Sequence, residues 1–230
     1  MVAAIRQSTT AVAAPATSIT VGPLSLSPLA GSLLLLAAGQ DGGHTQSPPA
    51  SDGWTKVGQY SSGGQSFMIA FKEATTGDTG SKTPTSDASD DFWSIYAELT
   101  GVSSSTMPNA INDVDEASGV TGNFPAVTPT VNDCIILLVG GVDNLAFGGV
   151  GNEPANYTIQ EIADEGSVCG CLGFRVLSGG ANVLEDPGNW TIVGGAGNDK
   201  SLVTMAIAPS ADGGGTILPT ILQHYHGGIG

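Results

Sequence analysis

Histidine is the residue type in this chain best suited to hold a transition metal, and the sequence contains His44, His224 and His226. In an extended segment, His224 and His226 would point to one side, because side chains two residues apart share a face. Three chains meeting on a threefold axis would then surround a metal with imidazoles. An ordinary tail with Tyr225 packed as an aromatic residue accounts for the same sequence. We therefore predict no metal and no cofactor, with His224 and His226 as the ligands if one is bound.

Two acidic clusters contain the oxygen ligands that calcium prefers. They are Asp113, Asp115 and Glu116, beside Asn112, and Asp87, Asp90 and Asp91. Neither follows the spacing of an EF-hand loop. We interpret both clusters, and His44 in its Gly-rich surroundings, as solvated loop residues.

The three cysteines lie in apolar, strand-like runs. Cys134 begins the run 134–138, and Cys169 and Cys171 alternate along another run, which places both on one face of a strand. An odd number of cysteines does not suit a disulfide framework. We predict buried free thiols, with a redox or metal-binding Cys-x-Cys pair as the alternative.

Common catalytic motifs are missing from the sequence. There is no Gly-x-Ser-x-Gly elbow, no Walker-type phosphate loop and no His-Glu-x-x-His. We predict that the protein is not an enzyme. Trp54, Trp93 and Trp190 could stack on sugars if they were exposed, whereas tryptophan within a strand more often packs in the core.

The charge of the chain argues against nucleic acid and membranes as partners. The chain has 6 basic and 21 acidic residues, which gives a net charge of −15. The basic residues are scattered along the sequence from Arg6 to Lys200. A phosphate backbone or an anionic lipid surface requires clustered Lys and Arg. The first 20 residues lack the continuous apolar core of a secretion signal. We therefore predict synthesis in the cytoplasm.

Short apolar runs separated by Gly, Ser, Thr, Asn and Asp indicate strands throughout, and helical periodicity is nearly absent. The runs 33–36 and 135–139 are apolar at every position, as in central strands covered on both faces. The predicted fold is all-β, a two-sheet antiparallel sandwich of jelly-roll-like type. Its strands span about 3–7, 18–21, 32–39, 54–60, 65–73, 92–101, 134–140, 157–162, 168–177, 190–193 and 201–208.

The two halves of the chain resemble each other. Residues 32–39 align with 133–140, Trp54-Thr55 with Tyr157-Thr158, and Phe71-Lys72 with Phe174-Arg175. Two equivalent strand sets that each bury one face are suited to a sandwich. Chance similarity between apolar strands is the alternative explanation.

We divide the chain into a sandwich at 1–210 and a tail at 211–230. Half 1 covers about 1–102, a long polar loop 103–131, and half 2 132–210, while 75–91 is expected to form a second loop. The tail begins with a Gly-rich linker, so its apolar residues cannot easily join the parent core. We predict that they contact a neighbouring subunit together with one residue of the long loop. These predicted contact residues are Phe124, Ile217, Leu218, Ile221, Leu222 and Tyr225.

A series of short motifs, most of them typical of β-strands, occurs within about residues 17–102. They are residues 31–36, Pro48-Pro49, 53–58 and 67–74. This series resembles the β-sandwich virion proteins of tailed bacteriophages. The His-x-His at 224–226 is similar to metal sites on the axis of trimeric phage fibres. The resemblance implies a jelly-roll-like subunit that decorates a capsid or belongs to a tail appendage, and it implies no catalysis.

The function we predict is therefore that of a capsid decoration, or cement, protein located in the virion. Its partners would be the major capsid protein or other virion proteins, and self-association as a homotrimer is expected. Two alternatives remain: a tail-fibre or receptor-binding subunit, and a carbohydrate-binding β-sandwich module.

Overall fold

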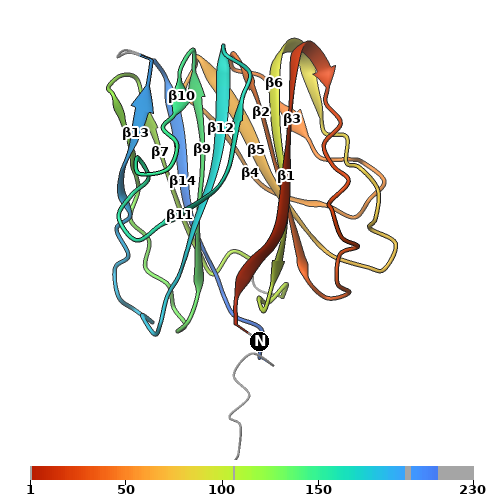
Figure 1. Ribbon diagram of the computed structural model, residues 1–230, viewed down its shortest axis with the longest axis vertical. Coiled ribbons are helices and arrows are strands. Elements are labelled where there is room, and N and C mark those ends of the chain that lie inside the picture. The colour runs from red at the N-terminus through yellow and green to blue at the C-terminus, as the bar shows by residue number, and fades with distance from the viewer. Residues whose placement is uncertain (1, 106, 195–197, 212–230) are drawn as a thin grey trace, which may run out of the picture.

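A computed structural model describes residues 2–105, 107–194 and 198–211 (Figure 1). The regular elements of these residues are strands, arranged in two large antiparallel sheets that face each other and a small third sheet. The prediction of an all-β antiparallel sandwich is confirmed. Residues 212–230, which hold the predicted contact tail, lie outside the described residues.

The first half of the chain forms one sheet, in the order β1-β6-β2-β5-β4, with β3 paired to β6. Leu33 at the start of β2 pairs with Leu99 of β6 and Glu73 of β5, so the central strand has partners on both sides. The strands are β1 (Ala4–Ser18), β2 (Leu33–Asp41), β3 (Gln46–Ser47), β4 (Thr55–Ser61), β5 (Gln65–Glu73) and β6 (Thr85–Thr100).

The second half forms the facing sheet, in the order β11-β12-β9-β14-β7, and a small sheet β10-β13-β8. The strands of the facing sheet are β7 (Ala110–Glu116), β9 (Ile135–Asp143), β11 (Thr158–Asp164), β12 (Val168–Val176) and β14 (Lys200–Ile207). Those of the small sheet are β8 (Thr121–Phe124), β10 (Ala146–Phe147) and β13 (Gly188–Val193).

The strand order is the same in both halves when β2 is matched with β9, β5 with β12, β4 with β11, β6 with β14 and β1 with β7. The predicted internal similarity is therefore present in the topology. The match of 32–39 with 133–140 was wrong by one residue, because Leu33 and Ile135 face the core between the sheets whereas Cys134 faces the outer side. Such a slip inverts every side chain of a strand.

The main core lies between the two sheets, where alternate residues of the facing strands meet. From the central strands, the cluster that fills this space contains Leu33, Leu35 and Ala37 of β2 and Ile135, Leu137 and Val139 of β9. Every residue of the apolar runs 33–36 and 135–139 is fully or almost fully buried. The prediction that both runs are central strands is therefore confirmed.

The outer face of each sheet is also covered, so the alternate residues of the central strands are buried too. Ile19, Val21 and Leu24 lie on the first sheet, in one cluster with Leu34 and Leu36. The small sheet covers the second sheet, where rings of Phe124, Phe147 and Trp190 pack together, with the Phe147 and Trp190 centroids 5.4 Å apart. This double cover explains why β2 and β9 are apolar along most of their length.

Two of the predicted loops contain strands. The segment 103–131 was predicted to be a polar loop, but it holds β7 and β8, and residues 85–91 of the second predicted loop belong to β6. Both predictions were wrong for the same reason. β7 is an edge strand rich in Asn and Asp, and the early part of β6 is polar because it extends beyond the core, so neither shows the apolar alternation of a strand.

Candidate functional site

Exposed apolar side chains gather at one end of the sandwich, where β1 begins and β14 ends. We call this the lower end, as it is drawn in Figure 1. It carries seven of the twelve exposed large apolar side chains of the described residues. They are Val2, Leu26, Leu29, Val131, Val176, Val183 and Leu184, and they come from both halves of the chain.

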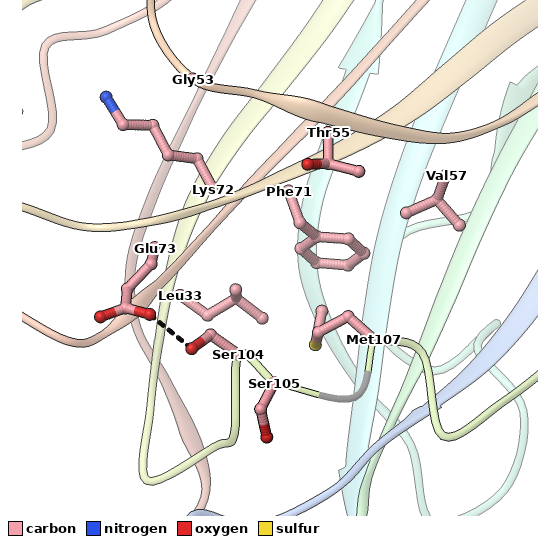
Figure 2. A pocket seen from close by; sticks show the side chains of 10 residues that line it. All are labelled: Leu33, Gly53, Thr55, Val57, Phe71, Lys72, Glu73, Ser104, Ser105 and Met107. Atoms are coloured by element: carbon pink, nitrogen blue, oxygen red, sulfur yellow. Dashed lines mark hydrogen bonds between the residues drawn. The ribbon is translucent and has the colours of Figure 1, made fainter.

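A pocket of about 290 Å³ opens between the sheets at this end (Figure 2). Its apolar wall consists of Leu33, Val57, Phe71 and Met107, which continue the core between the sheets. The pocket is therefore the place where that core reaches solvent, and its size suits an apolar side chain of a partner.

Several polar side chains around the pocket are already paired. Ser104 donates a hydrogen bond of 2.6 Å to Glu73 at the rim (Figure 2). The Lys72 ammonium lies 2.6 Å from Asp78 and 2.9 Å from Asp52, both beyond the pocket. Carboxylates of the same chain therefore hold the Ser104 hydroxyl and the Lys72 ammonium in place.

A second cavity, of about 440 Å³, lies beside Leu29, Thr100, Val102 and Ser210. Ser210 is close to the last described residue, and its amide donates to the Gly101 carbonyl at 3.0 Å. The last described residues of the chain therefore lie at the apolar lower end.

The opposite, upper end is acidic. Its carboxylates lie at the ends of central and edge strands of both sheets, and they include Asp41, Asp87, Asp90, Asp91, Asp143, Asp164, Glu165 and Asp199. Arg6, Lys72, Lys82 and Arg175 form ion pairs away from this end. The molecule thus has one acidic end and one end with exposed apolar side chains.

The predicted contact residue Phe124 is fully buried in the described structure, between Phe147 and Trp190. Its prediction as a partner contact was wrong, because the supposed loop around it is strand β8 of the small sheet. The other predicted contacts (Ile217, Leu218, Ile221, Leu222 and Tyr225) and the predicted metal ligands His224 and His226 lie outside the described residues.

The two acidic clusters have structural partners. Asp115 accepts a hydrogen bond of 2.5 Å from Ser201, and Glu116 accepts one of 3.1 Å from the Asn123 amide. His44 lies 3.4 Å from Asp90. Among the described residues, no group of three or more His, Cys, Asp or Glu side chains is arranged to hold a metal ion.

Two of the three tryptophans cannot stack on a sugar. Trp93 and Trp190 are fully buried, and the Trp190 indole donates a hydrogen bond of 2.8 Å to the Gly148 carbonyl. Trp54 is half-buried, edge-on to Tyr96, with its indole N–H donating to Asp52.

The three cysteines are free and buried, as predicted, and Cys169 and Cys171 share one face of β12. Burial raises the pKa of Cys134 to about 11 and that of Cys169 to about 12, so neither forms the reactive thiolate near neutral pH. We expect none of the three to react with a thiol reagent in the native protein and all three to react in denaturant. Rapid labelling of the native protein, measured by mass, would contradict this arrangement.

No family model, no curated protein and no solved structure matches this chain. In the part of the chain that the structure describes, no helix has the length and apolar character needed to cross a membrane. A function for the protein therefore has to be inferred from its own surface and interior.

The apolar side chains of the lower end were not among the contact residues predicted from the sequence. Val183 and Leu184, exposed by 60% and 64%, lie in a turn rich in Gly and Asn that precedes β13. Their signal was the presence of two adjacent large apolar residues in a segment that otherwise has the composition of a solvent-exposed turn.

Proposed function

We propose that this protein is a structural subunit of a larger protein assembly, in the role of a decoration protein on a phage capsid. It would bind the assembly through its lower end. The observation that carries the proposal is the number of exposed apolar side chains at the end where the core between the sheets also opens to solvent. Large exposed apolar areas mark interaction sites in soluble proteins.

The rest of the described molecule supports a mechanical role. Its cysteines are buried, its lysines are held by carboxylates or carbonyls, and its sheets are covered on both faces. Binding would bury the apolar side chains of the lower end, which contributes about 25 cal/mol per Å² before the cost of ordering. The acidic upper end would remain in solvent and keep the protein soluble.

The assignment to a tailed-phage virion depends on the resemblance of residues 17–102 to such proteins. The phrases that carry it, at 31–36, 53–58 and 67–74, fall on β2, β4 and β5 and on the turns beside them. A metal bound on the axis of a trimer would favour a tail fibre instead, and its ligands would be His224 and His226.

The test is the double variant Val183→Asp, Leu184→Asp, mixed with virions that lack the wild-type protein. Each buried Val or Leu contributes about 1.5–3 kcal/mol, so we expect binding to fall by about tenfold or more. Val150→Asp is the matched control, because Val150 is 91% exposed on the loop after β10, away from the lower end.

The variants should keep the circular-dichroism spectrum and the melting temperature of the wild type, because the substituted side chains are outside the core. Co-sedimentation with virions measures the occupancy. Wild-type occupancy in the double variant would reject the lower end as the docking surface. Truncation after residue 212 tests the separate contribution of the tail. We expect this truncation to reduce incorporation into virions without unfolding the sandwich.

A further inference from the structure

A pair of carboxyl groups lies between the two sheets at the upper end. Asp41 ends β2 and Asp143 ends β9, and these are the equivalent central strands of the two halves. Alternation from Leu33 and Ile135 turns both carboxyl groups toward the space between the sheets. The Gly42 amide, next to Asp41, donates to the Gly64 carbonyl at 2.8 Å, and a Cβ on Gly64 would lie 2.8 Å from an Asp143 carboxylate oxygen, so the two carboxyl groups lie near each other. A hydrogen bond between two carboxyl groups requires a proton on one of them.

Other acidic groups lie near this pair, and the imidazole of His44 lies 3.4 Å from Asp90, one of these groups. Asp199, before β14, lies close to Asp143: a Cβ on Gly64 would be 2.8 Å from a carboxylate oxygen of each. The negative charges of Asp90 and Asp91 on β6 raise the pKa of Asp41. The nearby Lys200 ammonium is turned away, and it donates to the Ser118 carbonyl at 2.8 Å.

A buried amide oxygen independently indicates that this space is short of donors. Gln65 is the partner of Asp41 in the β2–β5 pairing and is fully buried. Its Oε1 reaches across to the position that a side chain on Gly141 would occupy, two residues before Asp143, and finds no donor among the described residues. Acceptors that outnumber donors in a buried space favour the uptake of a proton.

We propose that Asp41 and Asp143 form a pH-sensitive contact that holds the two sheets together at mildly acidic pH and loosens their upper end when both groups are ionised. Below the transition, the shared proton bonds one sheet to the other. Above it, two or more negative charges face each other across the same space, and this repulsion is relieved by separation.

The expected direction of the pH dependence follows from the environment of the pair. Burial, with Asp41 and Asp199 nearby, raises the pKa of Asp143 to about 6, and burial with Asp90 nearby raises the pKa of Asp41. The folded protein therefore binds protons more tightly than the unfolded chain does. The stabilisation that the pair contributes is complete below the pKa of an aspartate in the unfolded chain, about 4. It is lost as the pH rises through the pKa of Asp143 in the folded protein, about 6.

The experiment measures thermal unfolding of the full chain from mildly acidic to slightly alkaline pH. We expect the melting temperature of the wild type to fall by about 3–6 °C across this range. Asp143→Asn and, independently, Asp41→Asn should remove most of this fall. Asp164→Asn, which changes an exposed carboxylate at the same end, should retain the wild-type pH dependence.

A wild-type pH dependence in both Asn variants would overturn the proposal, and so would a wild type whose melting temperature does not change across the range. Millimolar calcium distinguishes a cation site. If calcium at slightly alkaline pH raises the melting temperature of the wild type but not of Asp143→Asn, the pair binds a cation and the proton-based proposal is wrong.

Discussion

Replacing Glu98 by glutamine is expected to lower the free energy of unfolding by about 3–5 kcal/mol, as the loss of one partner of a buried ion pair commonly does. The Glu98 side chain is fully buried near the lower end of β6. One of its oxygens accepts from Arg6 at 2.6 Å and Gln7 at 2.5 Å. The other accepts from the Leu29 amide at 2.7 Å and the Ser32 hydroxyl at 2.8 Å.

Glutamine keeps the size of Glu98 but replaces one acceptor with an NH₂ group that faces donors. The segment before β2 should therefore detach from β1 and β6 as well. Chemical denaturation measures the loss, and proteolysis within 25–32 reports the detachment. Glu73→Gln is the matched control, because Glu73 is exposed and, among the described residues, its side chain accepts one hydrogen bond, from Ser104. Equal stability of Glu98→Gln and the wild type would contradict the structural role of this carboxylate.

The same site predicts a loss of stability in acid. Burial alone would raise the pKa of Glu98, but the hydrogen bonds from Leu29, Gln7, Ser32 and Arg6 outweigh burial and lower it. The stabilisation is present above the ordinary carboxyl pKa and is lost as the pH falls through the lowered value. This acid limb lies below the pH range in which the Asp41–Asp143 contact acts, so the two effects can be separated.

Replacing Trp93 by alanine is expected to lower the free energy of unfolding by about 3–5 kcal/mol. The substitution removes the largest side chain of the core between the sheets and leaves a cavity there. The Trp93 indole packs on Phe67, with ring centroids 5.7 Å apart, and occupies the space left by two glycines. A Cβ on Gly39 would be 2.7 Å from the indole, and one on Gly170 of the opposite sheet would overlap the ring. Thermal or chemical unfolding measures the loss.

The glycines provide the reciprocal test of the same packing. Gly170→Ala should destabilise the protein by about 1–3 kcal/mol through overpacking against Trp93. Gly149→Ala should have little effect, because nothing lies within 4 Å of the added Cβ and the backbone there needs no positive φ. If Gly170→Ala were as stable as Gly149→Ala, the close approach of the two sheets at Trp93 would be wrong.

The sequence was sufficient to predict the strands whose apolar pattern records their burial. The runs at 33–36 and 135–139, the strand at 65–73 and the shared face of Cys169 and Cys171 on β12 were each identified from residue type and spacing. Edge strands were missed where polar residues follow one another, as in β7, because pairing at a sheet edge requires no apolar residue there.

The candidate sites were less predictable because they depend on what lies opposite. Phe124 looks the same in sequence whether it faces solvent or two aromatic rings, and only the placement of β8 against β13 decides between them. The Asp41–Asp143 contact joins the ends of two strands that are far apart in the chain, and it could have been suggested only by a repeat aligned in the correct register.

The assignment of one whole sheet to each half of the chain has a consequence for biosynthesis. At the usual rate of about 5–20 residues per second, the first sheet leaves the ribosome roughly 5–20 seconds before the second is complete. During this interval Leu33, Leu35 and Phe67 have no opposite layer to cover them. A chaperone that shields this nascent surface, or a slow rate of production, should therefore increase the soluble yield of the protein.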